Sequence, residues 1–486
     1  MSINPWLQAQ WNSIHGDSRN SDCVPYPTAN RYEVLWRRLE GSAILFGPTI
    51  DCDGNLYLCS GRGEGHSHLH AFTASGDLRW ESTPWVNGIG IGPRASPFAP
   101  LVEDSGAVFV ADNLAFWCLE RDGTVRWRTD LQALDVREGF PSAVFSATGH
   151  VGGVSLDGTV LLLDRHSGEP IAPPLRLPPG VAPAAASLPP GIWRDSMDSD
   201  TAALLFPGFF GTHFPVTNSP AVHLETGLIY ITGAGETAEQ TRLYALREEP
   251  AGLAIAFTAT IAGRCSVTPS LSPDGDLVYT GNHRGELLAY CAASGELRWS
   301  YSPAGPAASP TVGGDGIVYT GSNTVPGQPS QLSAIDPVTG EARWCRDYDA
   351  LAADLLPERP VLEPLFADPR PRAVINSVQT IGRDHLLVVL ALGYTFTAPG
   401  AAPLTQPHRV VLASIDTGDG ELLGYSELPD TSEAAVVLDR NGTVYTCHAG
   451  LTSSIFYHGI NPILPPSHRT ELAPAGGVTA LRPLAA

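Results

Sequence analysis

The chain has 486 residues, and 43% of them are hydrophobic, so it can bury a large core. Its 29 basic residues stand against 50 acidic ones, and the formal net charge of −21 argues against nucleic acid or an anionic membrane as a partner. All the basic residues are arginine. The lack of lysine excludes Schiff-base chemistry, an amine general base and a Walker-type phosphate lysine.

The first residues, MSINPWLQAQWNSIHGDSRNSD, have no basic stretch followed by an apolar one. We therefore expect no secretory signal and a cytoplasmic location. No uninterrupted apolar run is long enough to cross a membrane. The eight cysteines are scattered without a CxxC pair or neighbouring cysteines, so we expect reduced thiols in the core and no disulfide framework.

One phrase recurs along most of the chain. Its clear copies are residues 47–80, 95–127, 266–299 and 308–344, and weaker copies lie at 141–170, 218–257, 360–424 and 431–460. Each copy has two strands joined by a D-G or N-G turn, a variable loop, and two more strands joined by an S-G or T-G turn. Four strands in each repeat of roughly 35–45 residues indicate a propeller blade. We predict an all-β, eight-bladed β-propeller with four-stranded antiparallel blades, forming one domain over residues 1–486.

The N-terminal segment YEVLWRRLE, residues 32–40, looks like a fourth strand without the first three. The last copy, 431–460, in turn has a poorly defined final strand. We expect the N-terminal strand to complete the last blade and close the ring, because closure removes exposed sheet edges.

The repeat resembles the quinoprotein-like repeat of pyrroloquinoline-quinone (PQQ) alcohol dehydrogenases and of an outer-membrane assembly lipoprotein. The shared phrase is the tryptophan-docking motif, present as AFTASGDLRW, CLERDGTVRW, AYCAASGELRW and AIDPVTGEARW. It places Trp80, Trp127, Trp299 and Trp344 in matching positions, and Trp36 fits the same position. The resemblance covers about residues 33–460 and implies the propeller fold. The dehydrogenases of this family hold their quinone against adjacent cysteines, which this chain lacks, so we expect no cofactor.

The turns and loops of such blades lie on opposite faces of the ring. The tight D-G, S-G and T-G turns lie on one, which we call the turn face. The loops between second and third strands and the connections between blades lie on the other, the functional face, where we expect chemistry. Two connections, 178–217 and 345–378, are too long for turns, and we interpret them as lids or pocket walls.

The candidate site residues come from loops of the functional face. We expect His213, His283 and His448 to be catalytic, because imidazole suits proton transfer near neutral pH. The expected substrate contacts are His66, Trp85, Arg94, Arg137, Phe210 and Arg284.

The stretch GRGEGHSHLHAF, residues 61–72, brings three histidines together in sequence. His70 takes a strand position of the repeat, so we expect it to pack inside the blade. Only His66 is then well placed to reach the centre of the ring, and we expect no metal site here.

Three functions remain open. The one we favour is a cofactor-free enzyme of the lyase, isomerase, cyclase or hydrolase type, acting on a small organic molecule in the central funnel. The second is a non-catalytic scaffold that recognises a protein partner on its rim. The third is an oxidoreductase that holds PQQ or a metal ion.

Overall fold

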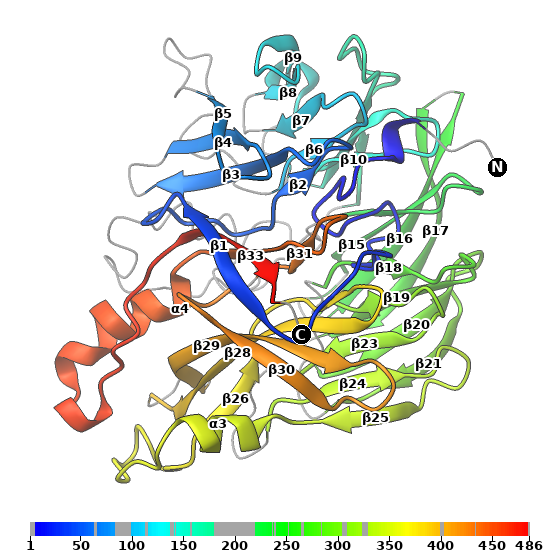
Figure 1. The fold of residues 1–486 in the computed structure, drawn as a ribbon. Coiled ribbons are helices and arrows are strands. Elements are labelled where there is room, and N and C mark those ends of the chain that lie inside the picture. Colours follow the sequence, from blue (N-terminus) through cyan, green and yellow to red (C-terminus); the bar gives the residue numbers. More distant parts are fainter. Residues whose placement is uncertain are drawn as a thin grey trace.

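The computed structural model describes the whole chain except residues 1–4, 63–65, 83–98, 112–114, 137–139, 141, 156–157, 179–218, 236, 238–239, 251, 264–266, 283, 304–308, 323–328, 399–402, 433 and 485–486. Its strands form eight antiparallel sheets arranged as the blades of a propeller (Figure 1). This confirms the predicted all-β, eight-bladed fold. Among the described residues, no helix is long and apolar enough to span a membrane.

The first four blades follow the chain, each running from its innermost to its outermost strand. Blade 1 is β2 (Thr49–Ile50), β3 (Leu56–Arg62), β4 (His66–Phe72) and β5 (Leu78–Glu81). Blade 2 is β6 (Leu101–Val102), β7 (Val108–Ala111), β8 (Ala115–Leu119) and β9 (Val125–Asp130). Blade 3 is β10 (Val144–Phe145), β11 (Val151–Val154), β12 (Thr159–Leu163) and β13 (Leu175–Arg176). Blade 4 is β14 (Ala221–Val222), β15 (Leu228–Ala234), β16 (Gln240–Glu249) and β17 (Gly252–Ala262).

The next three blades continue this order. Blade 5 is β18 (Ser270–Leu271), β19 (Leu277–Gly281), β20 (Leu287–Cys291) and β21 (Leu297–Tyr301). Blade 6 is β22 (Thr311–Val312), β23 (Val318–Gly321), β24 (Leu332–Ile335) and β25 (Ala342–Arg346). In blade 7 the long strand β28 (His385–Phe396) pairs with both β26 (Arg372–Ile375) and β27 (Thr380–Ile381), and β29 (Leu404–Asp416) and β30 (Leu422–Leu428) follow.

Blade 8 closes the ring with strands from both ends of the chain. It contains β31 (Val437–Leu438), β32 (Val444–His448), β33 (Gly477–Pro483) and, outermost, β1 (Tyr32–Arg38). The predicted closure by the N-terminal strand is confirmed. The third strand, β33, lies beyond the last repeat copy, residues 431–460. The chain reaches it through α4 (Leu451–Ser454), η3 (Ile455–Ile460), η4 (Asn461–Ile463) and η5 (Pro466–His468).

The hydrophobic core lies between neighbouring blades, and outer-strand tryptophans join five pairs of them. The indole N–H of each tryptophan donates, at 2.9–3.0 Å, to a carbonyl in the turn between third and fourth strands of the next blade. The five are Trp36, Trp80, Trp127, Trp299 and Trp344. In blade 4, Phe257 packs over the same turn of blade 5, at Gly295. The repeat therefore fixes how these six blades each sit on the next.

The predicted connection 345–378 begins inside β25, contains one helix, α3 (Asp349–Leu355), and includes β26. Between them, Arg359 is the main polar anchor. Its guanidinium stacks 3.7 Å from the Tyr394 ring centroid and hydrogen-bonds to Gln406, His408 and the His468 carbonyl. Burial lowers the pKa of His408 to about 3, with the Arg359 charge acting in the same direction. This connection is thus tied to blade 7 and to the C-terminal segment.

Candidate functional site at the ring axis

Residues 10–24, which we call the N-terminal belt, run along the inner ends of the blades. The last residue of the innermost strand in six blades donates its backbone N–H to a belt carbonyl, at 2.6–3.0 Å. The donors are Ile50, Val102, Val222, Leu271, Val312 and Ile381. These N–H groups lie on strand edges that face the ring axis and have no further strand to pair with, so the belt satisfies them. The belt thereby places its own polar side chains at the centre of the ring.

The belt folds into a compact loop between His15 and Asp22. The carboxylate of Asp17 accepts hydrogen bonds from the backbone N–H of Arg19 and Ser21, both at 3.0 Å. Asn20 and Asp22 have φ values of +55° and +49°, in the left-handed region. Asn and Asp tolerate this region better than most residues, although it still strains the backbone. Such strain often accompanies a functional site.

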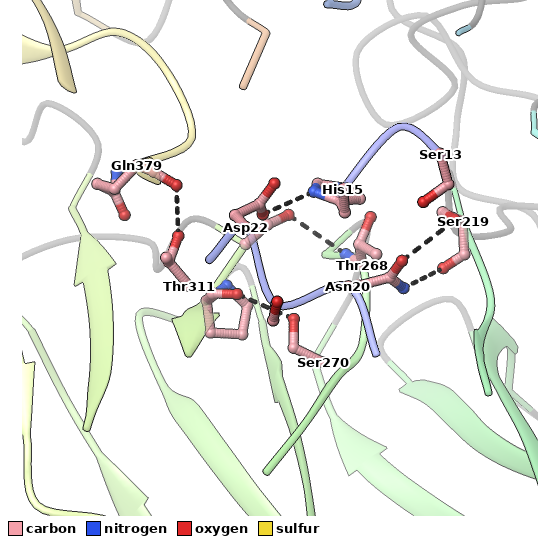
Figure 2. A network of polar contacts seen from close by, with 12 residues as sticks. Ser13, His15, Asn20, Asp22, Ser219, Thr268, Ser270, Thr311 and Gln379 are labelled. Carbon is pink, nitrogen blue, oxygen red and sulfur yellow. Dashed lines mark hydrogen bonds and ion pairs between the residues drawn. The ribbon is translucent and has the colours of Figure 1, made fainter. Parts of the chain in front are cut away.

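His15 and Asp22 form a buried pair at the end of this loop (Figure 2). With the carboxylate as acceptor, His15 Nδ1 donates to Asp22 Oδ2 at 2.8 Å. The side chains are 6% and 0% exposed. Burial raises the pKa of Asp22 above its ordinary value, and the neighbouring His15 opposes this rise. A carboxylate in this position fixes the ring orientation and the tautomer of the imidazole.

Polar side chains of four blades surround the pair (Figure 2). Asn20 Nδ2 donates to the carbonyls of Ser219 and Pro269 at 3.2 and 2.9 Å, which joins the belt to blades 4 and 5. Thr311 Oγ1 donates to the Gln379 carbonyl at 2.7 Å, which joins blades 6 and 7. The network therefore spans the side of the ring opposite blade 1.

Three buried oxygens in this region have no hydrogen-bond partner in the described part of the chain: Asp22 Oδ1, Thr268 Oγ1 and Gln379 Oε1. Their side chains belong to residues that are at most 1% exposed. An unpaired buried polar atom costs about 1–3 kcal/mol and calls for an explanation, such as a bound molecule that supplies the partner. Among the described residues, no atom forms a hydrogen bond with Nε2 of His15. These atoms are hydrogen-bonding groups without a protein partner among the described residues, and an imidazole oriented by a carboxylate is suited to proton transfer.

Most of the predicted site residues lie outside the described residues. These are His213, His283, Trp85, Arg94, Arg137 and Phe210, together with the connection 178–217 except its first residue. His66 begins β4, but only its backbone is described. Arg284 is exposed beside Gly263 at the functional end of blade 5. Their roles stay predictions.

His448 is the only predicted catalytic histidine within the described ranges, and it is fully buried at the end of β32. Its Nδ1 hydrogen-bonds to the Thr431 carbonyl, and its Nε2 to the hydroxyls of Thr446 and Thr479, all at 3.2 Å. Burial lowers its pKa, so the ring is neutral. The structure places it inside blade 8, with both nitrogens occupied. His70 is also buried, as its strand position predicted, with Nε2 2.8 Å from Ser60 Oγ.

Sequence reasoning missed the His15–Asp22 pair. The available signal was HGDSRNSD, residues 15–22, where small polar residues and Gly favour turns. Such a pattern predicts a compact loop, but it does not say which blades that loop contacts.

The described residues do not fit a metal–quinone centre. They contain no group of three or more His, Cys, Asp or Glu side chains arranged as metal ligands. Calcium takes six to eight oxygen ligands, and the belt offers the carboxylates of Asp17 and Asp22, which are already bonded to Arg19 and Ser21 and to His15.

Comparisons with known proteins agree on the architecture. A family model described as outer membrane protein assembly factor BamB matches residues 253–369. A comparison with curated proteins finds no match. Quinohemoprotein alcohol dehydrogenase from Comamonas testosteroni is 13% identical with a TM-score of 0.58, over 98% of this chain and 82% of that one. A europium-containing methanol dehydrogenase is 12% identical with a TM-score of 0.55, over 99% of both chains. At these identities the likeness shows the fold alone.

Proposed function

We propose that this chain, a β-propeller that resembles the PQQ-like, quinoprotein-repeat proteins, binds a small organic molecule at the ring axis and acts on it by acid–base chemistry. The observation that carries the proposal is the buried His15–Asp22 pair. In this role Nε2 of His15 takes or gives the proton, and Asp22 orients the imidazole. The reaction class is a lyase, isomerase, cyclase or hydrolase.

Three properties of the pair support a role in function. Asp22 is buried although burial disfavours its charge, its second oxygen has no partner among the described residues, and its backbone is strained. Each property lowers stability, and natural proteins break such local rules mainly at functional sites. The unpartnered Thr268 and Gln379 oxygens are the groups we assign to orienting the bound molecule.

The test is to follow consumption of metabolites by mass spectrometry when the purified protein is incubated with the small-molecule fraction of a cell extract. We expect His15→Gln to slow consumption of the substrate about 10²- to 10⁴-fold, the usual contribution of a positioned acid–base group. Asp22→Asn should slow it as well, because Asn accepts from Nδ1 without stabilising a charged imidazole.

The matched control is His166→Gln, since His166 is an exposed histidine in the turn between the third and fourth strands of blade 3. It should retain wild-type turnover. Full activity of His15→Gln would disprove the assigned role. If wild-type protein consumes no metabolite, the enzyme proposal fails, and a scaffold that binds a protein partner becomes the better reading.

The second candidate is a PQQ- or metal-dependent oxidoreductase. The two structural neighbours described above, both with TM-scores above 0.5, are named as dehydrogenases. Visible absorption and metal analysis of protein purified from its native host test it. An active protein without visible absorbance or bound metal would support the acid–base proposal. A stoichiometric quinone or metal would support the oxidoreductase.

A further inference from the structure

A hollow of about 870 Å³ lies on the turn face, across blades 4, 5 and 6. Its walls are tight turns, so it is separate from the loops of the functional face. Both signs of charge line it. The basic side chains are His223, Arg247 and Arg298, and the acidic ones are Asp274, Asp276 and Asp315. A ligand that carries both charges can therefore find partners for each.

Cys291 contributes a thiol to this hollow. It is the last residue of β20, and its carbonyl accepts the N–H of Gly295 at 2.8 Å in the turn that follows. The side chain is partly exposed. A hydrogen bond from Ser294, together with Arg298, lowers the pKa of Cys291 to about 7. Buried thiols of the core behave in the opposite way, since burial raises the pKa of Cys59 to about 12.

Tyr279 places a second unused polar group in the wall. Four other blades have a tyrosine at the same register position, and each of their hydroxyls donates to a protein oxygen at 2.8–3.3 Å. They are Tyr57, Tyr230, Tyr319 and Tyr445. Tyr279 is 0% exposed, and its hydroxyl has no partner in the described part of the chain.

The acceptor differs among the blades, and in blades 4 and 6 it is a carbonyl in the turn between third and fourth strands of the next blade, Ala292 or Thr417. In blades 1 and 8 the hydroxyl donates to Asp51 or Asp439, at the first position of the turn between first and second strands. Blade 5 has Ser272 at this position, and its hydroxyl donates to Asp274 instead. A buried hydroxyl that lines a hollow and lacks its usual acceptor indicates that a ligand supplies one.

We propose that this hollow binds a small disulfide with zwitterionic amino-acid ends and that Cys291 undergoes thiol–disulfide exchange with it. The Cys291 thiolate attacks one sulfur of R–S–S–R, the bond between Cys291 Sγ and that sulfur forms, and the original S–S bond breaks. The leaving thiolate takes a proton from water. The disulfide is the only oxidant required, and Tyr279 donates its O–H to a carboxylate of the bound molecule.

The experiment compares two probes on the full chain: oxidised glutathione, which carries ammonium and carboxylate groups at both ends, and bis(2-hydroxyethyl) disulfide, which carries no charge. Peptide mass spectrometry measures the rate of mixed-disulfide formation at Cys291 and at Cys345. Cys345 is the internal reference, because it is an exposed thiol on the outer strand β25, outside the hollow. Each Cys291 rate is divided by the Cys345 rate for the same probe.

We expect this ratio to be at least tenfold higher for oxidised glutathione than for the neutral disulfide. Tyr279→Phe should remove most of this preference and leave the ratio for the neutral probe unchanged, which separates binding from thiol reactivity. Tyr319→Phe, at the equivalent position of blade 6, is the matched control and should keep the preference. Equal ratios for the two probes would overturn the binding site, and a Cys291 rate at or below that of Cys345 would overturn the exchange.

Discussion

Asp22 shows how one residue can oppose stability at the centre of the ring. Its pKa is raised by burial, so the folded protein keeps the Asp22 proton to a higher pH than the unfolded chain does. The group therefore favours folding below its ordinary pKa, and this contribution is lost as pH rises through the raised, folded-state pKa. Asp22→Asn cannot titrate. We expect the free energy of unfolding of this variant, relative to wild type, to increase as pH rises from about 4 to neutral.

Unfolding curves for both proteins at several pH values measure this difference. Asp354→Asn is the control, because Asp354 is an exposed carboxyl on α3. The difference in free energy of unfolding between Asp354→Asn and wild type should stay constant over the same pH range. A constant difference for Asp22→Asn too would show that the buried carboxyl is not titrating with a raised pKa. A rising one would show that Asp22 titrates in the folded protein with a pKa above its ordinary value.

At the scale of elements, the turns between strands are where one blade recognises the next. Gly340 and Gly227 both have φ = +73° and close the same type of turn. A Cβ on Gly340 would lie 2.7 Å from the Trp299 indole, whereas a Cβ on Gly227 would meet nothing within 4 Å. Both alanine variants incur backbone strain of about 1–2 kcal/mol. We expect Gly340→Ala to lose a further 1–3 kcal/mol or so by overpacking, as measured by denaturant unfolding.

The comparison isolates the contact between blades, because the two glycines share their backbone geometry. Trp299→Ala should reduce the extra loss in Gly340→Ala, because it removes the indole atoms that would lie 2.7 Å from the added Cβ. If the two glycine variants are equally destabilised in the wild-type background, the tryptophan contact contributes nothing measurable.

An element can be predicted from the sequence when side chains that recur in every repeat hold it in place. The tryptophan positions and the place of β1 followed from the repeat, because side chains that dock on a turn must recur at each blade. The strand β33 was missed because residues 461–486 carry no copy of the repeat phrase. The belt was missed for a further reason: backbone N–H and carbonyl groups hold it, and these are the same in every residue.

At the scale of the whole molecule, the belt acts as a shared inner partner for six blades. Deleting residues 1–24 leaves β1 in place and removes the acceptors for six innermost strands. We expect backbone hydrogen exchange of Leu271, Val312 and Ile381 to accelerate strongly in the truncated protein, measured by mass spectrometry. Adding a synthetic peptide of residues 5–24 should restore the protection.

Blade 3 provides the internal control for this prediction. Its innermost strand, Val144–Phe145, has no backbone hydrogen bond to the belt among the described residues. Its exchange should therefore change little on truncation. If hydrogen exchange in blade 3 accelerates as much as in blades 5, 6 and 7, the belt stabilises the ring as a whole and not through the six hydrogen bonds. If no blade accelerates, the innermost strands do not depend on the belt, and the His15–Asp22 pair becomes the main reason for its presence at the axis.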